Sequence, residues 1–384
     1  MSRNANGEGS IYPWKRDGKP AGYKGALSYK DEDGATKRYV CYGRTRKEVK
    51  DKLDKARDRL DDGAPVKDSK QSIGEWLAYW RKTGLAASSR KESTKVLYGN
   101  LSRKHLEPAP FGAIRLDRLK PTDVDTLLLT LRQKDKPLAD STIFNIYCVL
   151  RAGLDGAVRD GLIAKNIAAK VDRPQVTKKD AQHIDAADLT KLLASADGLR
   201  YRDVLVLIAG TGMRRGEAVA LAWSKVSLDT GTMRVDATLS RVGKDLLITE
   251  PKTERSRRTV PLSPAMVSLL RSQKARQAAE RLRAGDQWTD TGLVFTTELG
   301  TAVDPRNILR TVELAAKKAG LGKVGVHTLR HSAATGWLES GVHIKAVSDL
   351  LGHSSISITG DIYGHTSDDT ARKAIEGWSG ALGL

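Results

Sequence analysis

Six side chains in the second half of this 384-residue chain could together act on a phosphodiester. They are, in order, Arg214, Lys252, His327, Arg330, His353 and Tyr363. Guanidinium groups can fork onto the non-bridging oxygens of a phosphate, which a lysine does less well. Lysine and histidine can donate or relay protons, and a tyrosine hydroxyl can attack phosphorus to form a covalent intermediate. The set predicts that a phosphodiester is broken and remade by positioning and charge stabilisation.

Each of these residues has a simpler interpretation when it is taken alone. An arginine on a helix more often forms a salt bridge, and a histidine more often caps a helix or makes a hydrogen bond in the core. Gly352, just before His353, could simply end a helix in the left-handed conformation. Tyr363 could be a packing residue. The chemical hypothesis therefore depends on the residues occurring together.

Their order, R…K…HxxR…H…Y, resembles the active-site signature of the tyrosine recombinases, in particular the phage and mobile-element integrases. The segments His327–His331 (HTLRH) and Leu350–Ser354 (LLGHS) are close to the family pattern, and the step from His353 to Tyr363 lies within its range. The resemblance implies an enzyme that cuts and rejoins duplex DNA through a covalent 3′-phosphotyrosine on Tyr363. Such an enzyme would integrate a phage or mobile element; whether it also excises one stays open.

Two positions in this signature have close rivals. The stretch TGMRRGE matches the family pattern TGxRxxE, which implies Arg214 rather than Arg215 as the catalytic arginine and Glu217 as its acidic support. Lys252 is favoured over Lys244, because Lys252 lies in a K-T…R-R-T-V-P-L context that the family shows before its last hairpin strand. On this basis Lys252 protonates the leaving 5′ oxygen.

The sequence gives little support for a cofactor or a metal ion. His327 and His331 are four residues apart, but HTLRH is not the HExxH zinc motif and no third ligand is apparent. No GxxxxGK[ST] phosphate loop is present. Three alternatives stay open: a chromosome-resolving tyrosine recombinase, a type IB topoisomerase with the same chemistry, and a catalytically silent DNA-binding protein on the same scaffold.

The composition favours a nucleic-acid partner. Lysine and arginine exceed aspartate and glutamate by 65 to 46, which gives a net charge of +19, and hydrophobic residues make up 40% of the chain. Cys41 and Cys148 form no metal or redox motif, which fits a reducing compartment. Neither a membrane-spanning run nor a signal-peptide core is visible. We therefore expect a location in the cytoplasm of a bacterial host cell and no membrane partner.

Residues 1–64 are expected to form a small α+β domain of three strands plus a helix. Short β-prone runs are separated by Asp-Gly turns, and a charged helix follows them. This arrangement resembles the arm-site DNA-binding domain of many phage integrases. Candidate contacts with DNA on its sheet are Arg16, Lys24 and Arg38.

Residues 65–174 are expected to form an all-α domain of four helices. Apolar residues recur there at helical spacing, and the pattern resembles the core-binding domain that tyrosine recombinases place against their crossover site. Arg90, Lys91 and Lys95 are candidate phosphate contacts.

Residues 175–384 are expected to form a mainly α-helical catalytic domain with a small antiparallel sheet. Its three strands are predicted at Thr232–Leu239, Leu246–Ile248 and Arg258–Pro261. The resemblance further implies a homotetramer on paired duplex sites, core and arm, with a host bending factor or a directionality factor as a further partner.

Overall fold

The computed structural model describes residues 10–16, 19–30, 36–61, 71–177, 182–251, 256–353, 355–363 and 376. The chain divides into two compact units, Met1–Thr177 and Lys178–Leu384. The predicted further division near residue 64 stays a prediction. No described helix is both long and apolar enough to cross a membrane.

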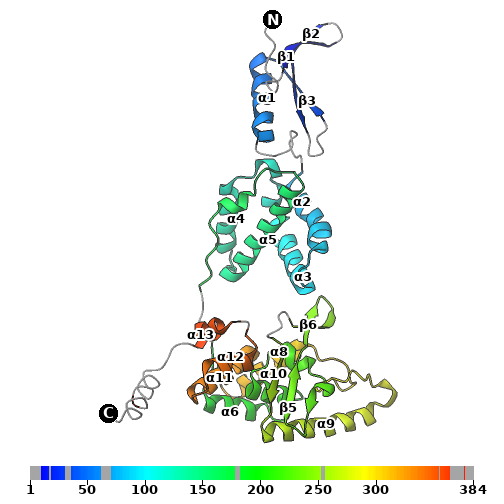
Figure 1. Cartoon of the computed structure of the whole chain (residues 1–384), viewed down its shortest axis with the longest axis vertical. Helices are drawn as coiled ribbons and strands as arrows, with labels where there is room; N and C mark the ends of the chain where they lie inside the picture. The colour runs from blue at the N-terminus through cyan, green and yellow to red at the C-terminus, as the bar shows by residue number, and fades with distance from the viewer. Residues whose placement is uncertain are drawn as a thin grey trace. The chain divides into compact units, whose positions relative to one another are not determined.

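The N-terminal unit begins with the predicted three strands and helix, which are confirmed (Figure 1). The strands β1 (Ser10–Arg16), β2 (Lys19–Lys30) and β3 (Thr36–Gly43) form an antiparallel sheet in that order. Helix α1 (Arg46–Asp61) packs on one face of the sheet. The core between them contains Leu27, Cys41, Val49, Leu53 and Ala56.

The rest of this unit is helical and has its own core. Its main helices are α2 (Ile73–Trp80), α3 (Glu92–Leu101), α4 (Pro121–Arg132) and α5 (Asp140–Arg159). Helix α5 carries an apolar stripe that is almost fully buried, and the indole Nε1 of Trp76 on α2 donates to the Gly153 carbonyl oxygen on α5 at 2.8 Å. That bond satisfies a buried donor and fixes α2 against α5.

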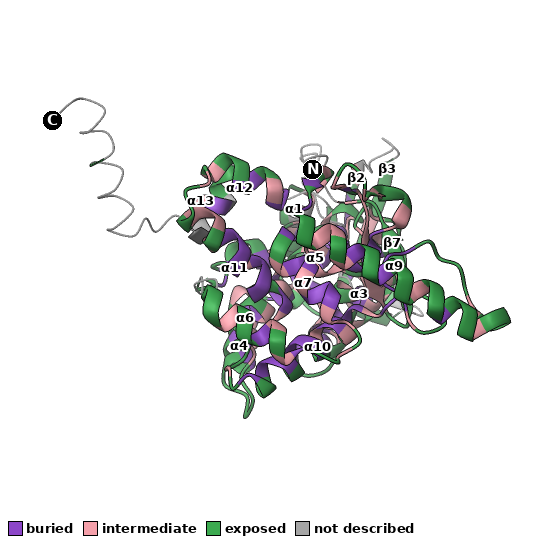
Figure 2. Cartoon of the chain, turned by 90° about the horizontal axis from the view of Figure 1, so that it is seen from below, coloured by how far each residue is buried: buried purple, intermediate pink, exposed green. Residues whose placement is uncertain are grey.

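The C-terminal unit is built around a buried helix, α7 (Arg202–Thr211). It packs against α11 (Val326–Glu339) and also contacts α8 (Arg215–Ala220), α9 (Pro264–Ala284) and α10 (Pro305–Lys318). Further described helices are α6 (Ala186–Ser195), α12 (Ile344–Leu351) and α13 (Ile356–Tyr363). Figure 2 shows the buried residues of α11 in purple. This mainly helical unit fits the expectation from the sequence.

The predicted three-stranded sheet is corrected by the structure. Strands β4 (Val226–Ser227), β5 (Thr232–Val235) and β8 (Arg258–Pro261) form one antiparallel sheet, whereas β6 (Thr238–Val242) and β7 (Asp245–Thr249) form a separate hairpin. The predicted first strand is divided at Asp236. The carboxylate of Asp236 forms an ion pair with Lys225, with Nζ 2.8 Å from Oδ2. The chain leaves the first sheet at this point, so β7 pairs with β6 and not with β8.

Candidate active site

Helix α12 and the segment after it bring several predicted residues together. A small core of Ala334, Val347 and Leu351 packs α12 against α11, which carries His327 and Arg330. Gly352 ends α12 with φ +64° in the left-handed conformation, and His353 follows. The end of a helix leaves carbonyl oxygens without a partner in the helix. In this protein arginine side chains occupy them.

Three consecutive carbonyl oxygens at the end of α12 each accept a hydrogen bond from a different arginine. Arg258 Nε donates to Leu350 at 2.6 Å, and Arg330 Nη2 donates to Leu351 at 2.9 Å. Arg214 Nη2 donates to the Gly352 oxygen at 3.2 Å. Cations are favoured at this negative end of the helix dipole. Two of these arginines, Arg214 and Arg330, are ones that the sequence assigned to a phosphate.

Arg214 and Arg330 differ in how far water reaches them. Arg330 is 4% exposed, and its Nη1 also donates to the Gly212 oxygen at the end of α7 at 2.5 Å. The Arg214 side chain is 36% exposed and forms an ion pair with Glu217, with Nη1 2.7 Å from Oε1. Arg214 lies between α7 and α8, so its position is set by the turn that joins these helices.

Glu217 is a buried carboxylate held by two arginines. Its Oε2 accepts from the Arg214 backbone N–H at 2.9 Å and from Arg258 Nη2 at 2.8 Å. Burial alone would raise the pKa of Glu217, but the charges and hydrogen bonds of Arg258 and Arg214 outweigh burial and hold it below its usual range. Glu217 is therefore an anion that orients Arg214.

The histidines of the site are uncharged at neutral pH. Burial lowers the pKa of His353 to about 4, and the charges of Arg330 and Arg214 act in the same direction. His327 is exposed on its outer side, but partial desolvation of its ring, followed by the charge of Arg330, also lowers its pKa. The pKa of the neighbouring His331 is likewise lowered to about 4, chiefly by burial. Neutral imidazoles can both accept and donate protons, which suits relay chemistry.

His353 is oriented by a residue of the next helix. Its Nδ1 lies 2.9 Å from the hydroxyl oxygen of Thr359 on α13, and Thr359 is fully buried. A hydrogen bond at Nδ1 fixes the ring and leaves Nε2 for other partners. The same helix ends at Tyr363, so α13 carries both the residue that orients His353 and the predicted nucleophile. Lys252 lies outside the described residues.

Two residues of this arrangement were not found from the sequence. Arg258 is 6% exposed at its side chain. The sequence did indicate that Arg258 is buried. Arg258 and Val260 are two residues apart on strand β8, so they share a face of the strand, and Val260 is buried. Thr359 carried no comparable signal, since its partner His353 lies on a different element.

The remaining candidates lie in the N-terminal unit. Lys24 lies across the sheet from Tyr12 and Tyr42, with Nζ 5.9 and 5.7 Å from their ring centroids. Arg38 is exposed and shares the face of Tyr42 by alternation on β3, whereas Arg16 is described only as the last residue of β1. Lys24, Tyr12, Tyr42 and Arg38 form the open sheet face.

The helical candidates cluster at the start of α3. The Arg90 guanidinium lies 5.4 Å from the ring centroid of Tyr98. Lys91 is the cap residue of α3, and Lys95 Nζ donates to the Ala86 oxygen at 2.7 Å. All three positions lie within or just before the first turn of α3.

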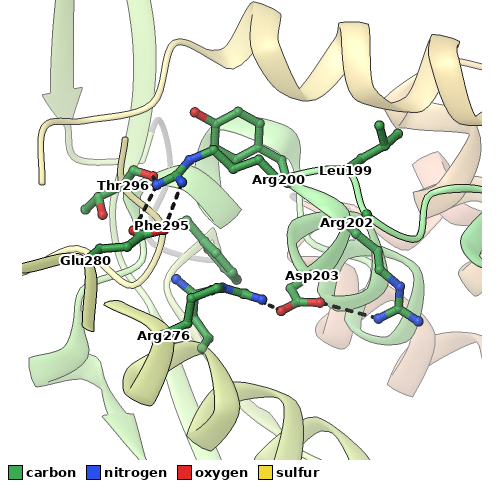
Figure 3. Close-up of a pocket in the computed structure, with 11 residues that line it drawn as sticks. Leu199, Arg200, Arg202, Asp203, Arg276, Glu280, Phe295 and Thr296 are labelled. Atoms are coloured by element: carbon green, nitrogen blue, oxygen red, sulfur yellow. Dashed lines mark hydrogen bonds and ion pairs between the residues drawn. The ribbon is translucent and has the colours of Figure 1, made fainter. Parts of the chain in front are cut away.

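A pocket separate from the candidate site lies at the start of α7, the end away from Gly212 (Figure 3). Its charged side chains are paired: Arg200 donates to both carboxylate oxygens of Glu280 at 2.8 and 2.9 Å, and Arg276 pairs with Asp203. These pairs join α9 to the start of α7. Among the parts of the chain that are described, no group of three or more potential ligands is placed to hold a metal ion.

Known proteins resemble this chain over most of its length. A tyrosine recombinase XerC-like protein of Caldanaerobacter subterraneus subsp. tengcongensis is 29% identical over 368 residues, which cover 90% of this chain and 93% of that protein. An integrase of Streptomyces ambofaciens is 28% identical over 334 residues, 84% of this chain and 83% of its own. A lambda integrase tetramer bound to a Holliday junction shares the fold, with a TM-score of 0.59, 19% identity, and coverage of 96% of this chain and 99% of that one.

The family comparison agrees with the resemblance that the motifs indicated. The model of the phage integrase family matches residues 176–370, just over half of the chain and all of the candidate active site. The chain therefore belongs to the phage integrase family and is a site-specific DNA recombinase of the tyrosine type.

Proposed function

We propose that this recombinase is the integrase of a phage or mobile element and that Tyr363 is its nucleophile. The phenol oxygen attacks phosphorus, the bond from phosphorus to the 5′ oxygen breaks, and a 3′-phosphotyrosine forms. Attack by the freed 5′ hydroxyl of another strand reverses these steps and releases Tyr363. The bond energy is conserved in the covalent link, so rejoining needs no nucleotide. The observation that carries the proposal is the set of arginines at the end of α12, with His353 next to them.

The two arginines have different tasks in this mechanism. Arg214, partly exposed and oriented by Glu217, presents its remaining N–H groups to a non-bridging oxygen. Arg330 is more deeply buried and is fixed by two carbonyl oxygens, so it holds its charge next to the same phosphate with little reorganisation. Preorganised donors of this kind stabilise the charge of the transition state better than water does.

Proton movement is assigned to the other three side chains. The low pKa values keep His327 and His353 neutral, so either can accept a proton or donate a hydrogen bond to the phosphate. Lys252 is the proposed general acid that protonates the leaving 5′ oxygen. The sequence supports Lys252 through its position between β7 and β8.

The N-terminal parts are proposed to hold DNA. The open sheet face combines basic and aromatic side chains on the side of the sheet away from α1, and we assign it to an arm sequence distinct from the crossover core. The start of α3, with Arg90, Lys91 and Lys95, is assigned to the core duplex. The active assembly is proposed to be a tetramer, as in the lambda integrase structure.

One experiment tests the reaction and finds the substrate. The full-length protein is incubated with fragments of DNA from its source and denatured, and the DNA that stays covalently attached is sequenced. Integrase function predicts a recurring core sequence with the protein on a 3′ phosphate. Tyr363→Phe should bind the recovered sequence equally well and form no adduct. An adduct on another residue would refute the assignment, and no adduct with the unaltered protein would favour a silent DNA-binding protein.

The recovered sites also separate the two kinds of recombinase. An integrase should return a core flanked by a second repeated motif, which the protein should still bind when the core is scrambled. A chromosome-resolving recombinase should return one site without such flanks. Affinity for the flanks should fall steeply with salt, because each phosphate contact releases a counterion.

A further inference from the structure

We propose that Arg258 is a positioning residue that sets the geometry of Arg214 and His353 without contacting DNA. The inference rests on the proposed function of the site. Arg258 lies on β8, outside the six residues of the signature, and its side chain is 6% exposed. It connects three separate segments of the unit: strand β8, helix α8 through Glu217, and the end of α12.

Every nitrogen of the Arg258 guanidinium already donates to the protein. Nε donates to the Leu350 oxygen at 2.6 Å, Nη1 to the Ser256 oxygen at 3.2 Å and Nη2 to Glu217 Oε2 at 2.8 Å. Burial and these three bonds leave little capacity for a phosphate oxygen. Arg214, by contrast, is 36% exposed at its side chain and so can reach a ligand. The two arginines share one carboxylate but are suited to different tasks.

The charge balance at Glu217 gives Arg258 its first role. Glu217 is 4% exposed, and a buried carboxylate needs compensating charge. Arg258 and Arg214 supply it together, one from inside the protein and one at the edge of the site. If Arg258 is removed, Arg214 alone must neutralise Glu217, and less of its charge is available to a phosphate. Arg258 therefore lets Glu217 orient Arg214 without cancelling its charge.

The end of α12 gives Arg258 its second role. The Leu350 carbonyl that Arg258 holds is followed by the two carbonyls that hold Arg330 and Arg214, and then by His353. A shift of Leu350 would therefore move all of these contacts. Arg258 also begins β8 and donates from Nη1 to the Ser256 oxygen, so it ties the start of this strand to the same helix end. Misplacement by about 1 Å can cost about 10²-fold in rate.

The test compares Arg258→Met and Arg258→Lys with Arg257→Met as a matched control. Arg257 is the next residue, its side chain is 37% exposed, and it pairs with Glu250 at 2.6 Å. The substrate is a nicked duplex with the core sequence on which the unaltered protein forms its adduct. Affinity at several salt concentrations and the single-turnover rate of adduct formation are measured for each variant. Failure of the unaltered protein would count against the proposed function and not against the role of Arg258.

A positioning role predicts a loss of rate without a loss of binding. Arg258→Met should form adduct about 10²-fold more slowly, with unchanged affinity and salt dependence. Arg258→Lys keeps the charge but cannot reach all three acceptors, so its rate should fall between those of the unaltered protein and Arg258→Met. Because it keeps the buried charge, it also guards against a folding failure of the methionine variant. Arg257→Met should keep the adduct rate.

A double variant identifies the route of the effect. If Arg258 acts through Glu217, Glu217→Gln combined with Arg258→Met should be no slower than the worse single variant. Multiplied losses would show that Arg258 does not act through Glu217 and would overturn the first of its two roles. A reduced salt slope for Arg258→Met would indicate a lost phosphate contact and overturn the whole inference. So would a fully active Arg258→Lys, since charge alone would then suffice.

Discussion

Replacing Gly352 with alanine should disturb the site from inside the protein. Gly352 has φ +64°, and a Cβ atom there would lie 2.9 Å from Arg258 Nη1 and 3.2 Å from its Cδ. The left-handed conformation costs a residue with a side chain about 1–2 kcal/mol. A free arginine could move away at little cost, but this one is buried and bonded to Leu350 and Glu217. Losing one such charge-assisted bond adds about 1.5–3 kcal/mol.

Gly341 provides the matched control for this prediction. It also has a positive φ, +86°, just after α11, but nothing lies within 4 Å of the position that its Cβ would take. Gly341→Ala should therefore cost only the backbone strain, about 1–2 kcal/mol. Gly352→Ala should cost about 2.5–5 kcal/mol, the sum of the strain and the displaced bond.

Hydrogen exchange of the α12 amides measures this difference in the full-length protein, because local opening of the helix need not unfold the unit. Each 1.4 kcal/mol corresponds to tenfold in the opening equilibrium. The amides of Val347 and Leu351 should therefore exchange about 10²-fold or more faster in Gly352→Ala than in the unaltered protein. Adduct formation should slow in parallel. Equal effects of the two alanine variants would refute the reasoning, because contact with Arg258 would then contribute nothing.

Three further predictions concern proton transfer and its orientation. Thr359→Val removes the hydroxyl that contacts His353 Nδ1 and should slow adduct formation about fivefold, since a typical hydrogen bond contributes about 1 kcal/mol, whereas Thr359→Ser should keep the rate. The free energy of unfolding should fall as the pH drops from about 6.5 to about 4, because the unfolded state binds a proton first where the folded pKa of His353 is lowered; titration by chemical denaturation should show a smaller fall in His353→Gln. Lys252→Ala should slow cleavage by about 10²–10⁴-fold, and a 5′-bridging sulfur, which leaves without protonation, should restore much of the rate; no rescue would leave Lys252 only a positioning role.

The sequence predicted the individual strands and helices of this protein better than the pairing of the strands. Three strands and a helix at the N-terminus follow from turn residues and from the alternation of apolar side chains, which are local signals. The division of the predicted strand at Asp236 was missed, because β5 and β6 pair with different strands and so belong to different sheets. Strand pairing is set by such contacts between distant segments, and residue preferences alone do not report them.

The same limit explains what was missed in the site. Arg214, Arg330 and His353 stand in short motifs, so their types and order could be recognised from the sequence alone. What joins them is a set of backbone carbonyl oxygens, and a carbonyl oxygen has no signature in the sequence because every residue carries one. The ends of helices are where such oxygens are available.

The end of α12 therefore links helix packing, backbone hydrogen bonding and the positions of the arginines. Its apolar face against α11 fixes the helix, the helix end presents free carbonyl oxygens, and the arginines that occupy them are held where a phosphate can bind. Buried arginines would otherwise be costly, since a charge without a partner is unstable in the interior. In this site the cost is offset by Glu217 and by the backbone, so the positive charge is in place before the substrate arrives. A recombinase of the tyrosine type depends on such charge, because catalysis of phosphoryl transfer rests on positioning and on electrostatic stabilisation.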